Sequence, residues 1–134
     1  MKLIKIETKK TPKEIIELVK TNASKFNFIV RDVFDMVHEF KSHGVNVQNN
    51  FKYYSIMFCN PQKAYESISK KLIRGVLLLP PKQVVVYQKD GKTEISYVAI
   101  EEKDVKKLFP EDEKFQKGLA ESCRNIIKLI SNIA

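Results

Sequence analysis

Two kinds of hydrophobic spacing divide the chain. Lysine alternates with leucine or isoleucine in residues 2–6, and runs rich in β-branched and aromatic residues recur at 26–34 and 53–58. Such segments are typical of β-strands, whose side chains point to opposite faces in turn. Residues 113–133 instead place apolar side chains every three or four positions, as an amphipathic helix does. The pattern therefore predicts helices and strands mixed along one chain.

Signals for helix starts and turns set the expected order of elements. Thr11 to Glu14 has the composition of a capping box followed by proline, which begins a helix. Asp35 should cap a short helix that Gly44 ends, and Asn60-Pro61 should open another that runs to about Lys71. Ala64, Tyr65 and Ile68 are expected on the inner face of that helix.

The second half of the chain is expected to be rich in hairpins. Asp90-Gly91 joins the β-rich runs 84–89 and 92–100, which is a strong hairpin signal. Gly75 to Leu79 is expected to be a short apolar strand that Pro80-Pro81 ends. Residues 101–112 are expected to be an acidic loop with one helical turn. The resulting order, β-α-β-α-β-α-β-β-β-α, predicts the α+β class.

For the predicted α+β fold we expect a largely antiparallel sheet, helices that pack mainly on one face, and a C-terminal helix that is the longest. The sequence contains no repeat, no low-complexity tract and no linker rich in Gly, Ser or Pro. We therefore expect residues 1–134 to form a single domain, since 134 residues is a common domain size.

Charge is unevenly distributed along the chain. The net charge is +8; residues 1–89 carry 16 basic and 7 acidic residues, whereas residues 90–134 carry 8 and 9. A basic surface attracts nucleic acid or anionic ligands. However, 21 of the 24 basic residues are lysines and they are scattered, which favours a solvated surface over nucleic-acid binding. The high lysine content without tryptophan is typical of heat-adapted proteins.

Compartment is inferred from what the chain lacks. No segment approaches the roughly 20 apolar residues of a membrane helix, and residues 1–11 have no continuous apolar stretch of the kind found in a signal peptide. We therefore expect a cytoplasmic protein with no membrane partner. In that compartment Cys59 and Cys123 are expected to be free thiols.

Cys59 is the candidate catalytic residue. It follows a strand and stands just before a helix N-terminus, where free N–H groups and the helix dipole stabilise a thiolate. The alternative is an inert, buried cysteine at the end of a strand. Asn60 is explained by helix capping, although it is also a candidate ligand-binding residue.

Tyr65 and Arg74 complete the candidate ligand-binding residues, because they flank the central helix and are expected to line a cleft near Cys59. His38 and His43 lie about 140° apart around a regular helix, so they cannot share one metal ion. The sequence has no phosphate-binding glycine loop, no nucleophile elbow and no zinc-protease motif. We therefore expect no metal and no cofactor.

Several motifs in order resemble the domain-of-unknown-function 302 family. They are Cys59-Asn60-Pro61, Ala64-Tyr65, an apolar run over 75–80, and the strand 84–87, together with the segment 28–45. The resemblance covers nearly the whole chain. It implies an α+β fold of the TATA-box-binding-protein-like type and a homodimer, and it implies no established activity. That topological likeness by itself says nothing about DNA binding.

One departure from the family pattern affects the chemistry. Many family members resemble "LLPC" after the apolar run, whereas this chain has Pro80-Pro81 with a residue inserted before the next strand. If the family's two cysteines form a redox or metal pair, this chain lacks the second one. Cys123 can replace it only where the last helix brings it near Cys59.

Three functions follow as hypotheses. The first is a non-catalytic binding domain that dimerises and holds an anionic or small apolar ligand in a cleft near Cys59. The second is a sulfur-carrier or redox role that uses the single thiol of Cys59. The third, which we favour least, is nonspecific nucleic-acid binding through the basic surface.

Overall fold

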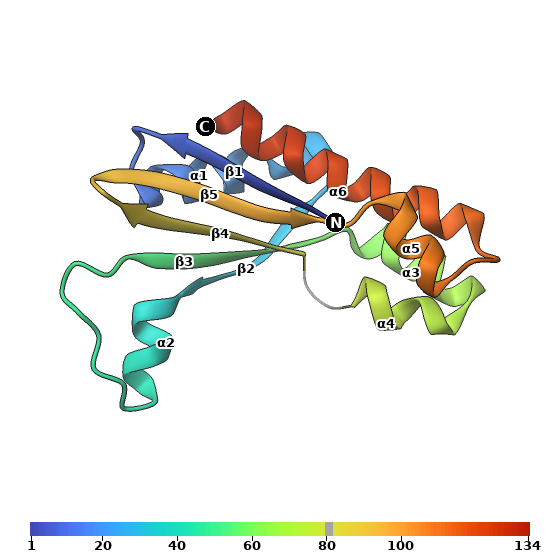
Figure 1. Ribbon diagram of the computed structural model, residues 1–134, viewed down its shortest axis with the longest axis horizontal. Helices are drawn as coiled ribbons and strands as arrows, with labels where there is room; N and C mark the ends of the chain where they lie inside the picture. Colours follow the sequence, from blue (N-terminus) through green and yellow to red (C-terminus); the bar gives the residue numbers. More distant parts are fainter. Residues whose placement is uncertain (80–81) are drawn as a thin grey trace.

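A five-stranded antiparallel sheet forms the centre of the protein. The computed structural model describes residues 1–79 and 82–134, and the strands lie in the order β1-β5-β4-β3-β2 (Figure 1). The strand bounds are β1 Lys2–Thr8, β2 Ile29–Asp35, β3 Tyr53–Cys59, β4 Lys82–Lys89 and β5 Lys92–Ala99. Every pair of neighbouring strands is antiparallel, as the hairpin-rich sequence predicted.

In the described residues, six α-helices and two short 3₁₀ helices complete the fold. The α-helices are α1 Pro12–Asn22, α2 Met36–Ser42, α3 Pro61–Lys70, α4 Gly75–Leu78, α5 Glu102–Leu108 and α6 Glu113–Ile133. The 3₁₀ helices are η1 Ala23–Phe26 and η2 Leu72–Arg74. The C-terminal helix α6 is the longest, with 21 residues. The α+β class with a long C-terminal helix is confirmed, and the TATA-box-binding-protein-like type is compatible with this arrangement.

The main core lies between the sheet and the helices α1 and α6. Alternate positions of the central strands point into it, including Ile56 of β3, Val84 of β4 and Ile95 of β5, all fully buried. α6 contributes residues at helical spacing, from Cys123 through Ile126 to Ile130, which are at most 1% exposed. The hydrophobic period of each element therefore decides which face it buries.

The predicted caps and turns are confirmed. The side chain of Thr11 accepts a hydrogen bond from the N–H of Glu14 (3.2 Å), and the Glu14 carboxylate accepts one from the N–H of Thr11. Asp35 caps α2 in the same manner. The hairpin turn between β4 and β5 has positive φ at both Asp90 and Gly91, 53° and 76°, which is the conformation that this dipeptide favours.

The predicted strand at Gly75 to Leu79 is wrong, because residues 75–78 form the helix α4. A short apolar run is compatible with a buried strand or a buried helix, and its period alone does not distinguish them. Leu77 and Leu78 pack against a small core, whereas Val76 is 66% exposed. The segment therefore buries one face and exposes the other, as an amphipathic helix does. Pro80-Pro81, expected to end that strand, lies outside the described residues.

Two further expectations are corrected. The segment 26–34 was expected to be strand throughout, but η1 continues to Phe26 and Asn27 ends it in the left-handed conformation (φ 65°), so that β2 begins only at Ile29. The acidic loop 101–112 contains a full helix, α5, instead of one turn. A capping box of Glu101 and Asp104 starts α5, and Val105 anchors it in the small core.

A second, smaller core lies beyond the end of the sheet where β3 leads into α3. Val105 of α5 packs there with Phe115 and Leu119 of α6, and Leu77 and Leu78 of α4 cover them. The helices α3, α4 and α5 gather at this end, alongside the N-terminal half of α6 (Figure 1). Within residues 1–79 and 82–134, we find no helix with both the length and the apolar character needed to cross a membrane.

Candidate ligand-binding site

The junction between β3 and α3 positions the predicted candidate residues. Cys59 ends β3, opposite Ile29 of β2, and its side chain is half-buried. Asn60 caps α3, since its Oδ1 accepts a hydrogen bond from the N–H of Lys63 (3.1 Å), and Pro61 occupies the first turn. The predicted capping role of Asn60 is therefore confirmed.

A cavity of about 440 Å³ opens beside this junction, and we call it the large cavity. α3 and the first turns of α6 form its sides, and the ends of β3 and β4 with α4 contribute the rest. Its apolar wall consists of Met57, Phe58, Ala64, Leu78, Leu79, Phe115 and Leu119. Seven basic residues also line it: Arg31, Lys63, Lys70, Arg74, Lys82, Lys114 and Lys117. Glu66 and Glu121 are its acidic residues.

Two of these basic side chains have carboxylate partners. Arg74 donates two hydrogen bonds of 2.8 Å to Asp112, and Lys117 lies 2.7 Å from Glu113. Among the described residues, no carboxylate comes within 4.0 Å of the other five: Arg31, Lys63, Lys70, Lys82 and Lys114. The large cavity therefore carries an excess of positive charge that the described part of the chain does not neutralise.

Lys82 is the most desolvated of these unpaired cations. It begins β4, lies half-buried, and places its Nζ 5.9 Å from the centre of the Phe28 ring. Burial lowers the pKa of its ammonium group, and the like charge of Lys63 acts in the same direction. The thiols of Cys59 and Cys123 are its other titratable neighbours. Lys82 therefore shares the large cavity with the candidate Cys59 and is the least exposed of the five unpaired cations.

Two more lysines that line the large cavity lie close to each other. Lys70 belongs to the last turn of α3, and Lys114 belongs to the first turn of α6. The proximity of Lys70 lowers the pKa of Lys114, and the charge of Arg74 contributes further. Like charges repel at this range, so an anion placed between the two ammonium groups would be attracted to both.

Gly118 leaves room in the large cavity. It lies inside α6, where glycine destabilises a helix by roughly 0.5–1 kcal/mol relative to alanine. Neither a positive φ nor a close neighbour requires it, since an added Cβ would meet no atom within 4 Å. Because Gly118 lines the cavity, the missing side chain enlarges the space for a ligand.

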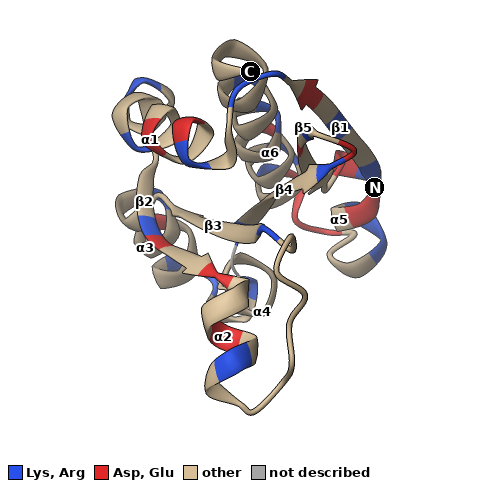
Figure 2. Ribbon diagram, turned by 90° about the vertical axis from the view of Figure 1, so that its left-hand side faces the viewer, with Lys and Arg blue, Asp and Glu red and all other residues tan. Residues whose placement is uncertain are grey.

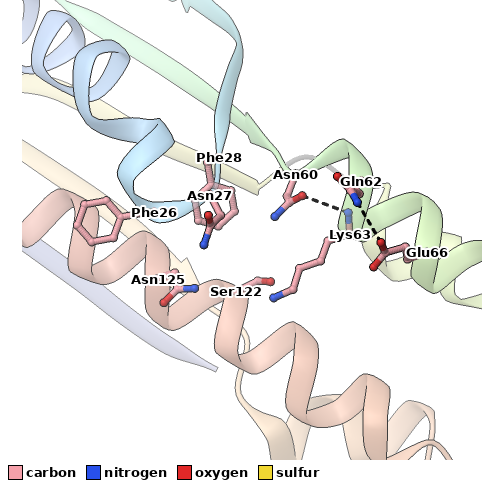
Figure 3. Close-up of a pocket in the computed structure, with 9 residues that line it drawn as sticks. All are labelled: Phe26, Asn27, Phe28, Asn60, Gln62, Lys63, Glu66, Ser122 and Asn125. Atoms are coloured by element: carbon pink, nitrogen blue, oxygen red, sulfur yellow. Dashed lines mark hydrogen bonds between the residues drawn. The ribbon is translucent and has the colours of Figure 1, made fainter.

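A smaller, polar cavity of about 360 Å³ adjoins the first and shares Asn60, Lys63, Glu66 and Ser122 with it. Figure 3 shows the Lys63 side chain extending from α3 toward Ser122 of α6, with the amides of Asn27, Asn60 and Asn125 around the space beside it. Because the Oδ1 of Asn60 is engaged as a helix cap, its Nδ2 donor is left for the cavity. The two cavities therefore meet at Lys63.

The structure brings together three of the four predicted site residues. Cys59, Asn60 and Arg74 all line the large cavity. Tyr65 does not line either cavity, and it is 75% exposed on the outer side of α3. Its expected place on the inner face is wrong: α3 buries no residue fully, and the half-buried positions are Ala64, Ser67 and Ile68.

Arg74 is mainly a structural residue. Its side chain is 6% exposed, and besides Asp112 it donates a hydrogen bond to the carbonyl of Ser67 (3.1 Å). The guanidinium lies 5.6 Å from the Phe115 ring centre, within the range of a cation–π contact. Asp112 also caps α6 by accepting a hydrogen bond from the N–H of Phe115 (3.3 Å). The pair therefore joins η2 to the start of α6.

Both cysteines are free thiols in the structure. Cys123 is 1% exposed within the main core, in the same buried cluster as Tyr97. Single-thiol chemistry at Cys59 remains a prediction. Within residues 1–79 and 82–134, no group of three or more His, Cys, Asp or Glu side chains is placed to hold a metal ion.

The sequence analysis did not single out Lys63, Lys82, Lys114 or Gly118. A signal for two of them was present, because Lys63 and Lys114 stand in the first turns of helices, where the dipole disfavours a cation. A glycine inside an otherwise regular amphipathic helix was a signal for Gly118. For Lys82 no signal existed, since a lysine at the start of a strand is ordinary.

The comparisons with known proteins agree with the resemblance found in the sequence. The family model described as "Domain of unknown function DUF302" matches residues 4–133, and the chain therefore belongs to this family. A search of curated proteins finds no match.

A solved structure shares the fold. The crystal structure of an uncharacterized conserved DUF302 protein from Bacillus stearothermophilus has a TM-score of 0.69 and 21% sequence identity to this chain. The match covers 99% of this chain and 95% of the other. At this identity the likeness establishes the fold alone, so the function must be argued from the site.

Proposed function

We propose that this domain binds a small organic anion with an apolar part in the large cavity. One observation carries the proposal: five basic side chains with no carboxylate within 4.0 Å, among the residues that the structure describes, share a cavity with seven apolar residues. A carboxylate, phosphate or sulfonate would neutralise that charge, and the apolar part would cover the wall of α4 and α6. The volume, about 440 Å³, lies in the range of small-molecule pockets, roughly 300–1,000 Å³.

A small ligand is favoured over a nucleic acid. Elsewhere on the molecule, acidic residues are interleaved with basic ones on α1, α2 and β1, as Figure 2 shows. A nucleic-acid surface needs a continuous basic stripe along the backbone of its partner. The unpaired charge instead converges on a recess between two helices, where a compact anion has the best access to several cations at once.

Two fluorescent dyes test this proposal. 8-Anilinonaphthalene-1-sulfonate is an apolar anion, and N-phenyl-1-naphthylamine has the same aromatic rings without the sulfonate. We expect the sulfonate dye to bind at one saturable site and octanoate to displace it, while the neutral dye binds at least about tenfold more weakly, because one charge-assisted contact amounts to about 1.4 kcal/mol.

Variants locate the bound dye. We expect Lys70→Gln combined with Lys114→Gln to weaken sulfonate binding about tenfold, since two partly exposed charge contacts are lost. Gly118→Phe, which fills the cavity, should abolish binding. The matched control is Lys9→Gln combined with Lys13→Gln, which removes two exposed charges far from the cavity. Equal binding of both dyes, or equal losses in the two lysine pairs, would refute the proposal.

We also propose that the domain associates with a second copy of itself, as the family resemblance implies. The support is an exposed apolar surface on η2 and α4, formed by Leu72, Ile73, Val76 and Leu79, each more than 60% exposed. Such surfaces are typical of interfaces. Light scattering should give twice the chain mass, and Val76→Lys should give a monomer without loss of stability. A monomeric parent protein at all concentrations contradicts this proposal.

A further inference from the structure

Lys82 has an environment that differs from that of an ordinary surface lysine. Its neighbours come from four parts of the chain: Phe28 before β2, Cys59 of β3, Lys63 of α3 and Cys123 of α6. Lys63 is the other cation among these groups, and its charge opposes protonation of Lys82, whereas negative charge on Cys123 or Cys59 would favour it. The side chain lines the large cavity, so a ligand that enters the cavity can reach it.

The absence of a counter-ion changes the chemistry of this amine. Among the described residues no carboxylate lies within 4.0 Å of its Nζ, so no ion pair there compensates for the loss of water. The Phe28 ring favours the ammonium form, whereas burial lowers the pKa of Lys82. A larger fraction of neutral amine is therefore present than for a solvated lysine.

A desolvated lysine next to another cation is a known arrangement for a nucleophilic amine, because both effects favour the neutral form with its lone pair. A simpler explanation is that the aliphatic part of Lys82 only covers Phe28 and Phe58 while its ammonium group reaches water. The two explanations differ in whether a carbonyl compound bound in the cavity becomes attached to Lys82.

We infer that Lys82 forms an imine with an aldehyde or ketone that carries a carboxylate or phosphate group. The lone pair of Nζ attacks the carbonyl carbon, the carbonyl oxygen takes up a proton, and the resulting carbinolamine loses one water to give C=N. The sum of the step is amine plus carbonyl to imine plus water, so no oxidant or reductant is needed.

This inference rests on the proposed function for the class of substrate. Arg31, Lys70 and Lys114 line the same cavity and would hold the anionic group, while the apolar wall would face the carbon skeleton. Anion binding brings the carbonyl to Lys82 at a high effective concentration, which distinguishes this lysine from exposed ones. Simple aldehydes without an anionic group should react less selectively.

Pyridoxal 5′-phosphate, an aldehyde with a phosphate group, is the probe. The full-length protein is incubated with it at neutral pH and treated with sodium cyanoborohydride, which reduces an imine to a stable amine, and peptides are then mapped by mass spectrometry. We expect Lys82 to be labelled about tenfold faster than exposed Lys13, which corresponds to about 1.4 kcal/mol from the phosphate contacts. Pyridoxal without phosphate should label Lys82 less selectively.

Two variants separate reactivity from folding. Lys82→Met fits the apolar surroundings, and Lys82→Arg keeps the charge but cannot form an imine. Both should lose the early label, and the thermal unfolding of Lys82→Arg should match that of the parent protein. A label spread over exposed lysines, with Lys82 labelled no faster than Lys13, would overturn the inference.

Dye binding distinguishes the proposal of anion binding from that of imine formation at Lys82. If the sulfonate dye binds in the cavity but Lys82 is not labelled, anion binding stands and imine formation is wrong. If Lys82 is labelled selectively by both pyridoxal 5′-phosphate and pyridoxal while the sulfonate dye fails to bind, the amine is reactive and the proposed anion site is wrong.

Discussion

Arg74 and Lys82 both line the large cavity, but only Arg74 has a carboxylate partner among the described residues. The guanidinium of Arg74 is buried and fully engaged, with a bidentate pair to Asp112 and a further bond to the Ser67 carbonyl. The side chain of Lys82 is half-buried, and no carboxylate of the described residues lies within 4.0 Å of its ammonium group. The first arrangement satisfies its charge within the protein, whereas the second leaves the ammonium group without an ion-pair partner in the described residues.

The difference separates a structural charge from a candidate functional one. A buried cation that is fully paired contributes to the rigidity of the site, and removal of one partner leaves an uncompensated charge. An unpaired cation in a cavity is costly for the folded state, which makes it a candidate for ligand binding. We therefore expect substitutions of Arg74 to affect mainly stability, and substitutions of the unpaired lysines to affect mainly binding.

Arg74→Met should have the largest effect on stability. It leaves the Asp112 carboxylate buried without its partner, and we expect the free energy of unfolding to fall by about 3 kcal/mol. Urea denaturation measures this. The control Arg124→Met removes an exposed arginine and should change stability by less than about 0.5 kcal/mol. Equal effects of the two substitutions would contradict a structural role for Arg74.

The pH dependence of the free energy of unfolding tests the structural role of Arg74 further. The hydrogen bonds from Arg74 hold the pKa of Asp112 below its ordinary value, which is about 3.9 for an unfolded chain. A lowered pKa means that the pair stabilises the fold fully above that value, and that this stabilisation is lost as pH falls toward the folded pKa. Denaturation of the parent protein and Arg74→Met should therefore converge in acid, and a constant difference down to pH 2 would contradict this cause.

Most of the fold could be predicted from the sequence, because local signals and hydrophobic periods agree there. Thr11, Asp35 and Asn60 are found at the helix starts they predicted, and the Asp90-Gly91 hairpin forms as expected. Residues 75–78 could not be assigned in this way. Their conformation depends on the small core formed with α5 and α6, which are distant in the sequence.

The site was predictable only in part. Its position near Cys59 follows from a strand that leads into a helix start, which is a local signal. Lys82 and Lys114 come from other elements, and only the tertiary fold brings them to the same cavity. Arg74 was a candidate for ligand binding, but its pairing with Asp112 spans 38 residues and could not be foreseen from either residue alone.

Gly118→Ala is the smallest and most discriminating change. Alanine is the better helix former, and its Cβ would meet no atom within 4 Å, so we expect the free energy of unfolding to rise by about 0.5–1 kcal/mol. The methyl group occupies part of the cavity, so binding of the sulfonate dye should weaken, by about twofold. A gain in stability would show that the glycine is kept at a cost to the fold, as the cavity argument requires. A loss of stability would mean that the backbone itself needs glycine at this position, and the case for a cavity kept open by Gly118 would fail.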